Sequence, residues 1–124
     1  MLVPILKQGD FLIASIQSAL TDTDLLRLRD DVAEQVGRYR SRGVIVDVTV
    51  LDVMDSFAVR TLNSLAQMIM LRGAETVIVG IQPDVAFAMV QLGLTLGGVA
   101  TALDLEEGLA YLQERTKRSG RRAR

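Results

Sequence analysis

The sequence predicts an α/β fold, a sandwich in which about four helices pack on a mixed, mostly parallel central sheet. The chain has 124 residues, 49% of them hydrophobic, which suffices for one core of two or three layers. Two compact β-branched runs, at residues 44–48 and 76–79, are typical of strands buried on both faces. A segment with helical spacing separates these runs, as in a βαβ unit with parallel strands.

The amino-terminal part of the chain predicts a β-hairpin followed by an amphipathic helix. Apolar runs at residues 3–6 and 11–14 flank the polar turn 7–10, and the proline in the first run is tolerable in an edge strand. Several N-cap candidates at residues 21–24 then precede apolar residues at helical spacing. This helix is expected to end near residues 42–43, where a glycine opens the next strand.

The remainder of the chain predicts three further helices and a last strand. Residues 56–72 carry apolar side chains along one stripe and are followed by a glycine. Residues 84–92 form a short helix that a proline opens and a glycine closes. A short strand at 99–102 precedes a helix that Asp104 can cap and that ends at about Arg115. The expected element order is ββαβαβαβα.

The composition excludes several classes of chemistry. The chain has no histidine and no cysteine, which excludes Ser-His and Cys-His nucleophile pairs, disulfides and thiolate metal sites. Aromatic residues make up 4% of the chain, too few for stacking platforms that bind single-stranded nucleic acid. Neither a secretory signal nor a run of about 20 apolar residues is recognisable. We therefore expect a cytoplasmic protein with no cofactor and with neither nucleic-acid nor membrane partners.

Charge is distributed unevenly along the chain. Residues 1–116 hold 9 basic and all 15 acidic groups, a balance of 9 − 15 = −6, whereas five basic residues fall in the last eight positions. We expect a single domain at 1–116 and a basic, disordered tail at 117–124. A nucleic-acid or anionic-surface arm is the less favoured interpretation of that tail, because one short basic run is a weak signal.

Three carboxylates lie close together in the sequence after the first buried strand. Asp47, Asp52 and Asp55 fall near the carboxyl end of that strand, where α/β proteins commonly place function. Such a group could bind Mg²⁺ and support a metal-dependent phosphohydrolase, which we keep as a remote alternative. The spacing matches no phosphatase pattern, and no lysine occurs between Lys7 and Lys117 to assist phosphate transfer. We therefore assign no catalytic residue and no metal ligand.

Ser56 stands at the predicted start of the helix that follows this strand. A serine there can act as the N-cap, which stabilises a helix by about 1 kcal/mol. It is also suited to phosphorylation, because it lies at a loop-helix junction where the helix N-terminus favours negative charge. A phosphate adds roughly −1.5 to −2 charges. Next to Asp55 and near Asp52, this charge would repel a docked partner, so the sequence predicts a phosphorylation switch.

Three apolar residues surround this junction: Val53, Met54 and Phe57. The strand and helix cores do not obviously need all three, and an exposed apolar patch commonly marks a partner site. Alternatively, they close the end of the sandwich. The sequence favours both interpretations equally, and we treat the three as partner-docking candidates.

The chain resembles the STAS domain family, which includes anti-sigma factor antagonists and the tails of sulphate transporters. The resemblance covers nearly the whole chain and rests on a strand ending in Val46-Asp47-Val48, a short loop, and Asp55-Ser56 opening a helix. Many simple antagonists have a small residue after the serine, whereas Phe57 follows here. In this respect and in its minimal length, the chain most resembles the RsbS-type scaffolds of the bacterial stressosome.

The resemblance implies a fold, partners and a phosphorylation site. It implies a STAS-type sandwich that co-assembles with sensor-bearing RsbR-type paralogues in homo- and hetero-oligomers and sequesters an RsbT-type serine/threonine kinase. Ser56 would be the phosphoacceptor whose modification releases the kinase in a stress response, and an RsbX-type phosphatase would reset it. Asp47 and Asp55 would shape the site. Thr49 lies near a position where paralogues can carry a second acceptor. The alternative is a simple anti-sigma factor antagonist that binds an anti-sigma kinase.

Overall fold

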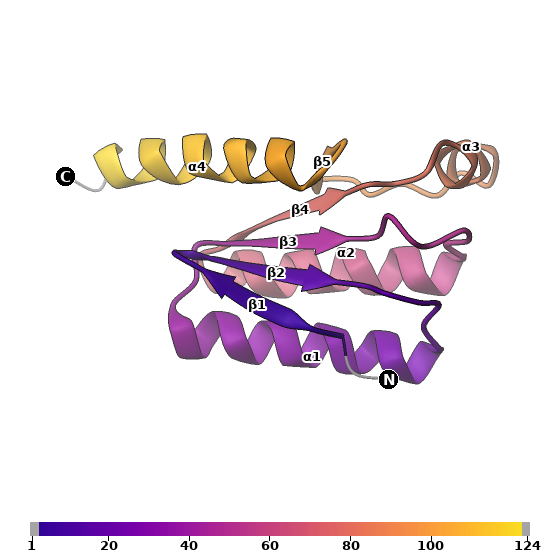
Figure 1. The fold of residues 1–124 in the computed structure, drawn as a ribbon, viewed down its shortest axis with the longest axis horizontal. Coiled ribbons are helices and arrows are strands. Elements are labelled where there is room, and N and C mark those ends of the chain that lie inside the picture. Colours follow the sequence, from indigo (N-terminus) through magenta and orange to yellow (C-terminus); the bar gives the residue numbers. More distant parts are fainter. Residues whose placement is uncertain (1–2, 123–124) are drawn as a thin grey trace.

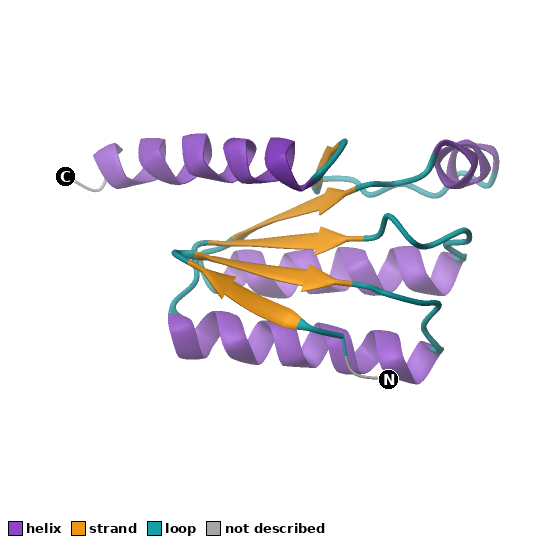
Figure 2. Cartoon of the chain, viewed as in Figure 1, coloured by secondary structure: helices purple, strands orange, loops and turns teal. Residues whose placement is uncertain are grey.

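The computed structural model describes residues 3–122 and shows a five-stranded sheet between two layers of helices (Figures 1 and 2). The strands lie in the order β1-β2-β3-β4-β5; β1 is antiparallel to β2, and all other pairs are parallel. The helices α1 and α2 cover one face and α4 covers the other. The elements are β1 Ile5–Gln8, β2 Phe11–Ser15, α1 Asp22–Tyr39, β3 Gly43–Asp47, α2 Ser56–Leu71, β4 Glu75–Val79, α3 Pro83–Gln91, β5 Ala100–Ala102 and α4 Leu105–Arg122.

The predicted element order and mixed sheet are confirmed. Side chains of β2, β3 and β4 alternate between two apolar clusters, because successive residues of a strand point to opposite faces. Val44 and Val46 pack toward α1 and α2, whereas Ile45 packs with Leu112 of α4. All four side chains are essentially inaccessible to solvent. The central strands are therefore buried on both faces, as their β-branched composition indicated.

The hairpin differs from the prediction in the length of its turn. Residues 7 and 8 were expected in the turn, but they belong to β1, and Gln8 pairs with Phe11. Only Gly9 and Asp10 lie between the strands, and Gly9 has a φ of 60°. A two-residue hairpin turn favours a positive φ, which glycine adopts without strain. The glycine therefore permits a tighter turn than the polar run suggested.

The helix α1 begins as predicted and ends earlier. Thr21 is its N-cap in a capping box: the Thr21 hydroxyl accepts from the Asp24 N–H, and the Asp24 carboxylate accepts from the Thr21 N–H, both at 3.1 Å. The helix ends at Tyr39 because Arg40 takes a left-handed conformation, with φ 50°. The predicted end near residues 42–43 is therefore wrong by about three residues.

The helix α4 is longer than predicted. It continues to Arg122, past the expected end at Arg115, and so includes most of the segment that we expected to be a separate tail. Residues 123–124 of that segment lie outside the described residues. Asp104 caps this helix as predicted, because its carboxylate accepts from the Glu107 N–H at 2.9 Å. The domain boundary at residue 116 stays a prediction.

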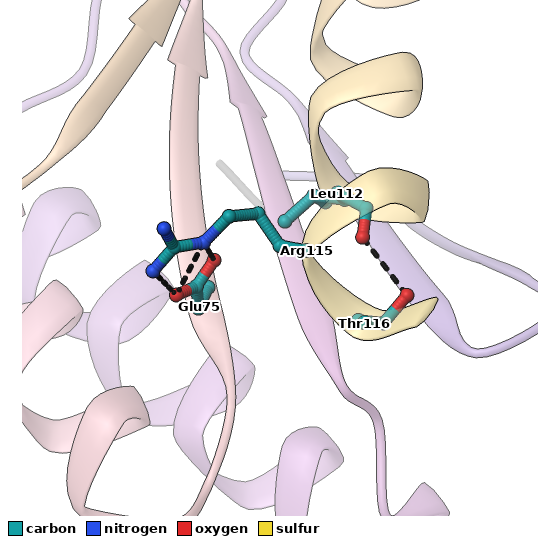
Figure 3. Close-up of polar contacts among 4 residues, drawn as sticks. All are labelled: Glu75, Leu112, Arg115 and Thr116. Atoms are coloured by element: carbon teal, nitrogen blue, oxygen red, sulfur yellow. Dashed lines mark hydrogen bonds and ion pairs between the residues drawn. The ribbon is translucent and has the colours of Figure 1, made fainter. Parts of the chain in front are cut away.

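An ion pair links α4 to the sheet (Figure 3). The Arg115 guanidinium donates from Nη2 to Glu75 Oε1 at 2.5 Å and from Nε to both carboxylate oxygens at 3.0 and 3.1 Å. These hydrogen bonds raise the pKa of Arg115 above its ordinary value. The next residue, Thr116, donates its hydroxyl to the Leu112 carbonyl within the helix at 2.9 Å. In the part of the chain that the structure describes, no helix is long and apolar enough to span a bilayer.

Candidate functional site

The candidate site lies in the loop between β3 and α2, at the carboxyl ends of the parallel strands (Figure 1). Loops at this edge are the usual place for function in α/β folds, because the sheet holds their ends rigidly while their tips remain accessible. Val48 anchors the start of the loop: it is buried, and its N–H donates to the Val79 carbonyl at 3.0 Å. Met54, also buried, anchors the end of the loop.

Asp55, and not Ser56, is the N-cap of α2. The Asp55 backbone is extended, and its Oδ1 accepts from the Ala58 N–H at 2.8 Å. Ser56 is instead the first helical residue and is exposed. The prediction that Ser56 caps the helix is therefore wrong. Within the described residues the Ser56 hydroxyl has no hydrogen-bond partner, so the arrangement leaves an uncommitted hydroxyl on the first turn of a helix.

Asp47 organises the opposite end of the loop. Its Oδ1 accepts from the Thr49 N–H at 2.9 Å and from the Thr49 hydroxyl at 2.5 Å. The Thr49 carbonyl accepts from Gln82 Nε2 at 2.6 Å, which connects this loop to the one between β4 and α3. Gly80 lies directly against Thr49, where a Cβ would collide with the threonine hydroxyl. The Thr49 hydroxyl is consequently committed to a structural hydrogen bond.

A groove runs beside the α2 N-terminus, between this loop and the start of α1. Its apolar lining comes from Ala19, Leu20, Leu25, Val50, Leu51, Val53 and Ala58, and its acidic lining from Asp22, Asp52 and Asp55. No basic side chain is among these lining residues. The groove therefore combines an apolar floor with carboxylates, and it lies immediately next to the Ser56 junction.

The three apolar docking candidates have different surroundings. Val53 is 75% exposed and lines the groove, so it is available to a partner. Phe57 is half-buried. Met54 is only 5% exposed and belongs to the core cluster between the sheet and α1 and α2. Met54 therefore closes the end of the sandwich, which was the alternative to a docking role, and it is not a surface contact.

The three loop carboxylates do not form a metal site. Within residues 3–122, no group of three or more acidic side chains is arranged so that it could hold a metal ion. Asp47 instead binds Thr49, and Asp55 caps α2. Two of the three, Asp47 and Asp55, therefore each accept a backbone N–H of their own turn, and the geometry gives the phosphohydrolase alternative no support.

Sequence reasoning missed two parts of this region. Asp22 reaches the groove from the start of α1, and Gln82 reaches Thr49 from the loop after β4. Asp22 comes after β2 and Gln82 comes after β4, so both lie at the edge of the sheet where the parallel strands end. A comparison of all residues after parallel strands, rather than one loop at a time, could have suggested this convergence.

Comparison with known proteins places this geometry in a family. A family model for the STAS domain matches residues 3–107. The chain is 29% identical over 92 residues to the RsbT co-antagonist protein RsbRA of Bacillus subtilis (strain 168), a match that covers 74% of this chain. It covers 34% of RsbRA, so the chain spans about a third of that relative's length.

Solved structures share both the fold and part of the sequence. A variant of Moorella thermoacetica RsbS with serine replaced by glutamate is 32% identical, with a TM-score of 0.80 over 93% of this chain and 97% of that one. A chain of the stressosome, described as a signal integration and transduction hub, is 33% identical, with a TM-score of 0.77 over 91% and 98%. The unphosphorylated anti-sigma factor antagonist SpoIIAA, at 14% identity and a TM-score of 0.72 over 90% and 96%, shares the fold. Fold, sequence and the extent of the family match agree: the chain belongs to the STAS domain family.

Proposed function

We propose that this chain is a non-enzymatic stressosome scaffold and phosphorylation switch, which holds a serine/threonine kinase until Ser56 is phosphorylated. The observation that carries the proposal is the exposed, uncommitted Ser56 hydroxyl on the first turn of α2. Because Asp55 performs the capping, modification of Ser56 removes no hydrogen bond from the described fold. The modification can therefore change the surface while the domain stays folded.

Electrostatics and burial explain how one phosphate would release a partner. The helix N-terminus stabilises the phosphate on the free chain, since its unpaired N–H groups carry partial positive charge. A kinase seated on the adjacent groove would have to enclose this dianion beside Asp52 and Asp55, away from water. Burying charge without a paired partner is strongly unfavourable. Phosphorylation therefore weakens any complex that covers this junction with apolar contacts.

The relatives support the choice of partners. One is named an RsbT co-antagonist, which fits capture of an RsbT-type kinase, and another is part of a stressosome, which fits assembly with RsbR-type paralogues. An RsbX-type phosphatase would remove the phosphate and restore the scaffold. Solvent-exposed Val53 and half-buried Phe57 would supply the apolar contacts to the kinase.

A pull-down of the RsbT-type kinase tests the switch. The wild type and Ser56→Ala should retain the kinase equally, whereas Ser56→Asp should retain at least about tenfold less, which corresponds to about 1.4 kcal/mol. Thr95→Asp is the matched control, because it adds the same charge at an exposed position in the loop between α3 and β5. Equal retention by Ser56→Asp and the control would contradict the charge switch.

The simple anti-sigma factor antagonist remains a second candidate because SpoIIAA has the same fold. Particle size separates the two functions. Mixed with an RsbR-type paralogue, a stressosome scaffold should elute as a very large particle, whereas an antagonist should form only a small complex with an anti-sigma kinase. Size-exclusion chromatography with light scattering measures this difference directly.

A further inference from the structure

A small hollow lies where β4 begins, at the end of the sheet opposite to the Ser56 junction. The pairing of β5 with β4 starts at Val77, so Glu75 and Thr76 have no neighbouring strand on the β5 side. The helices α2 and α4 cover opposite faces of the sheet, yet both contribute side chains to this hollow, because the sheet is incomplete there. The hollow therefore joins the two helical layers around the first residues of β4.

Thr76 gives the hollow a hydroxyl that no other group uses. The residue is only 7% exposed, and it lies on the α2 side of the sheet, as Ile78 does two residues further along. Within the described residues its Oγ1 has no hydrogen-bond partner, and Asn63 Oδ1 is the only other buried side-chain atom of which this is true. Rotation about χ1 exchanges the hydroxyl and methyl positions of Thr76 without breaking a hydrogen bond. Since a buried hydroxyl without a partner is unfavourable, a polar group that enters the hollow and bonds to it is stabilised.

The two charged residues that line the hollow neutralise each other. The Arg115 guanidinium donates to both carboxylate oxygens of Glu75 (Figure 3), and it also lies 5.7 Å from the centroid of the Tyr111 ring. The other lining residues are uncharged. An anion or a cation that entered the hollow would lose hydration without gaining a free counter-charge, which is unfavourable. The hollow therefore favours a neutral ligand.

The rest of the lining sets the size and the polarity of such a ligand. Ala66 and Met70 of α2 and Ala100 of β5 present small or flexible apolar groups, and Met70 is 65% exposed, so the hollow is open to solvent on its side. The volume of the hollow is about 120 Å³. Because a cavity of about 150 Å³ accommodates benzene, this volume suffices for about five non-hydrogen atoms. The ligand that fits is small and has an apolar end.

We propose that this hollow binds a small neutral molecule with one amide or hydroxyl group, which forms a hydrogen bond with Thr76 while its apolar end contacts Ala66 and Met70. A threonine hydroxyl both donates and accepts, and amide and hydroxyl groups complement both roles. The ligand contacts both helical layers, since Tyr111 of α4 lies in the same wall. None of these residues belongs to the Ser56 junction, so the site does not depend on the proposed phosphorylation switch.

Titration of the ¹⁵N-labelled full chain, followed by two-dimensional NMR, tests the site with three probes of equal size. Propionamide is neutral, propionate is its anionic counterpart and propionamidinium its cationic one. Propionamide should shift the backbone amide signals of Thr76, Ala100 and Tyr111 to saturation. Both ions should bind at least about fivefold more weakly, because neither finds a free counter-charge in the hollow.

Variants of the lining locate the bound probe. Thr76→Val keeps the shape of the side chain and removes its hydroxyl, so it should raise the dissociation constant of propionamide about fivefold. Thr101→Val is the matched control, because it removes an exposed hydroxyl of β5 that lies outside the hollow, and it should bind as the wild type does. Ala66→Leu fills the hollow from α2 and should abolish saturable binding.

Circular dichroism establishes that each variant is folded. If Thr76→Val does not fold, the comparison of Ala66→Leu with the wild type decides the question. Shifts that do not saturate, shifts confined to residues outside the hollow, equal affinity for the three probes, or unchanged binding in folded Thr76→Val or Ala66→Leu would each overturn the proposal.

Discussion

Two hydroxyls follow β3, that of Thr49 in the loop and that of Ser56 on the first turn of α2, and they differ in their hydrogen bonding. Thr49 donates its hydroxyl to Asp47 and is tied through its carbonyl to Gln82, whereas the Ser56 hydroxyl has no partner in the described residues. An aspartate precedes each hydroxyl, and each aspartate accepts from a backbone N–H. Only Asp47 also accepts a hydrogen bond from the hydroxyl that follows it, that of Thr49. The comparison shows how one strand-to-helix connection can present both a structural hydroxyl and a chemically available one.

The largest loss of folding stability is expected where Thr49 packs on Gly80. Gly80→Ala should destabilise the fold by roughly 2 kcal/mol or more, because φ at this position is 82° and the new Cβ collides with Thr49. Gly93→Ala is the matched control, with φ 69° and no atom within 4 Å of its Cβ, and should cost only about 1 kcal/mol. Urea denaturation of both variants measures the difference; equal losses would argue against close packing of Thr49 on Gly80.

A smaller loss of folding stability should follow when the N-cap of α2, next to Ser56, is removed. Asp55→Ala removes the acceptor for the Ala58 N–H and should lower the free energy of unfolding by about 1 kcal/mol. Ser56→Ala, one residue further along, should change it by less than about 0.5 kcal/mol, because no described hydrogen bond is lost. Thermal and urea unfolding check this order. If Ser56→Ala lowered the free energy of unfolding more than Asp55→Ala, Ser56 and not Asp55 would be the N-cap.

Among the variants that remove a described hydrogen bond, the smallest loss of stability is expected at the turn that Asp47 organises. Asp47→Ala removes two hydrogen bonds from a partly exposed site and should cost about 0.5 to 1 kcal/mol. Asp47→Asn should lose less, because the amide oxygen can still accept from the Thr49 N–H. Denaturation curves for the two variants distinguish loss of the acceptor from loss of the charge, and identical losses would show that the charge carries the interaction.

Local sequence signals predicted much of the fold and part of the site. The β-branched runs of β3 and β4 indicated buried strands, and the position of Ser56 at the start of α2 was correct. The choice of cap was wrong because Asp55 and Ser56 both favour that role, and the helix register depends on tertiary packing of residues such as Met54 and Val59, which are both buried. The Thr49–Gln82 contact joins residues 33 positions apart, which no local pattern reports.

Phosphate mapping tests the central claim most directly. The chain is incubated with its RsbT-type kinase and ATP, digested with trypsin and analysed by mass spectrometry. Both hydroxyls occur on one tryptic peptide, residues 43–60, so fragment ions between Thr49 and Ser56 assign the phosphate. The account predicts one phosphate at Ser56, absent from Ser56→Ala. A phosphate at Thr49 or elsewhere with Ser56 unmodified, or no phosphate under conditions in which the kinase is active, would contradict it.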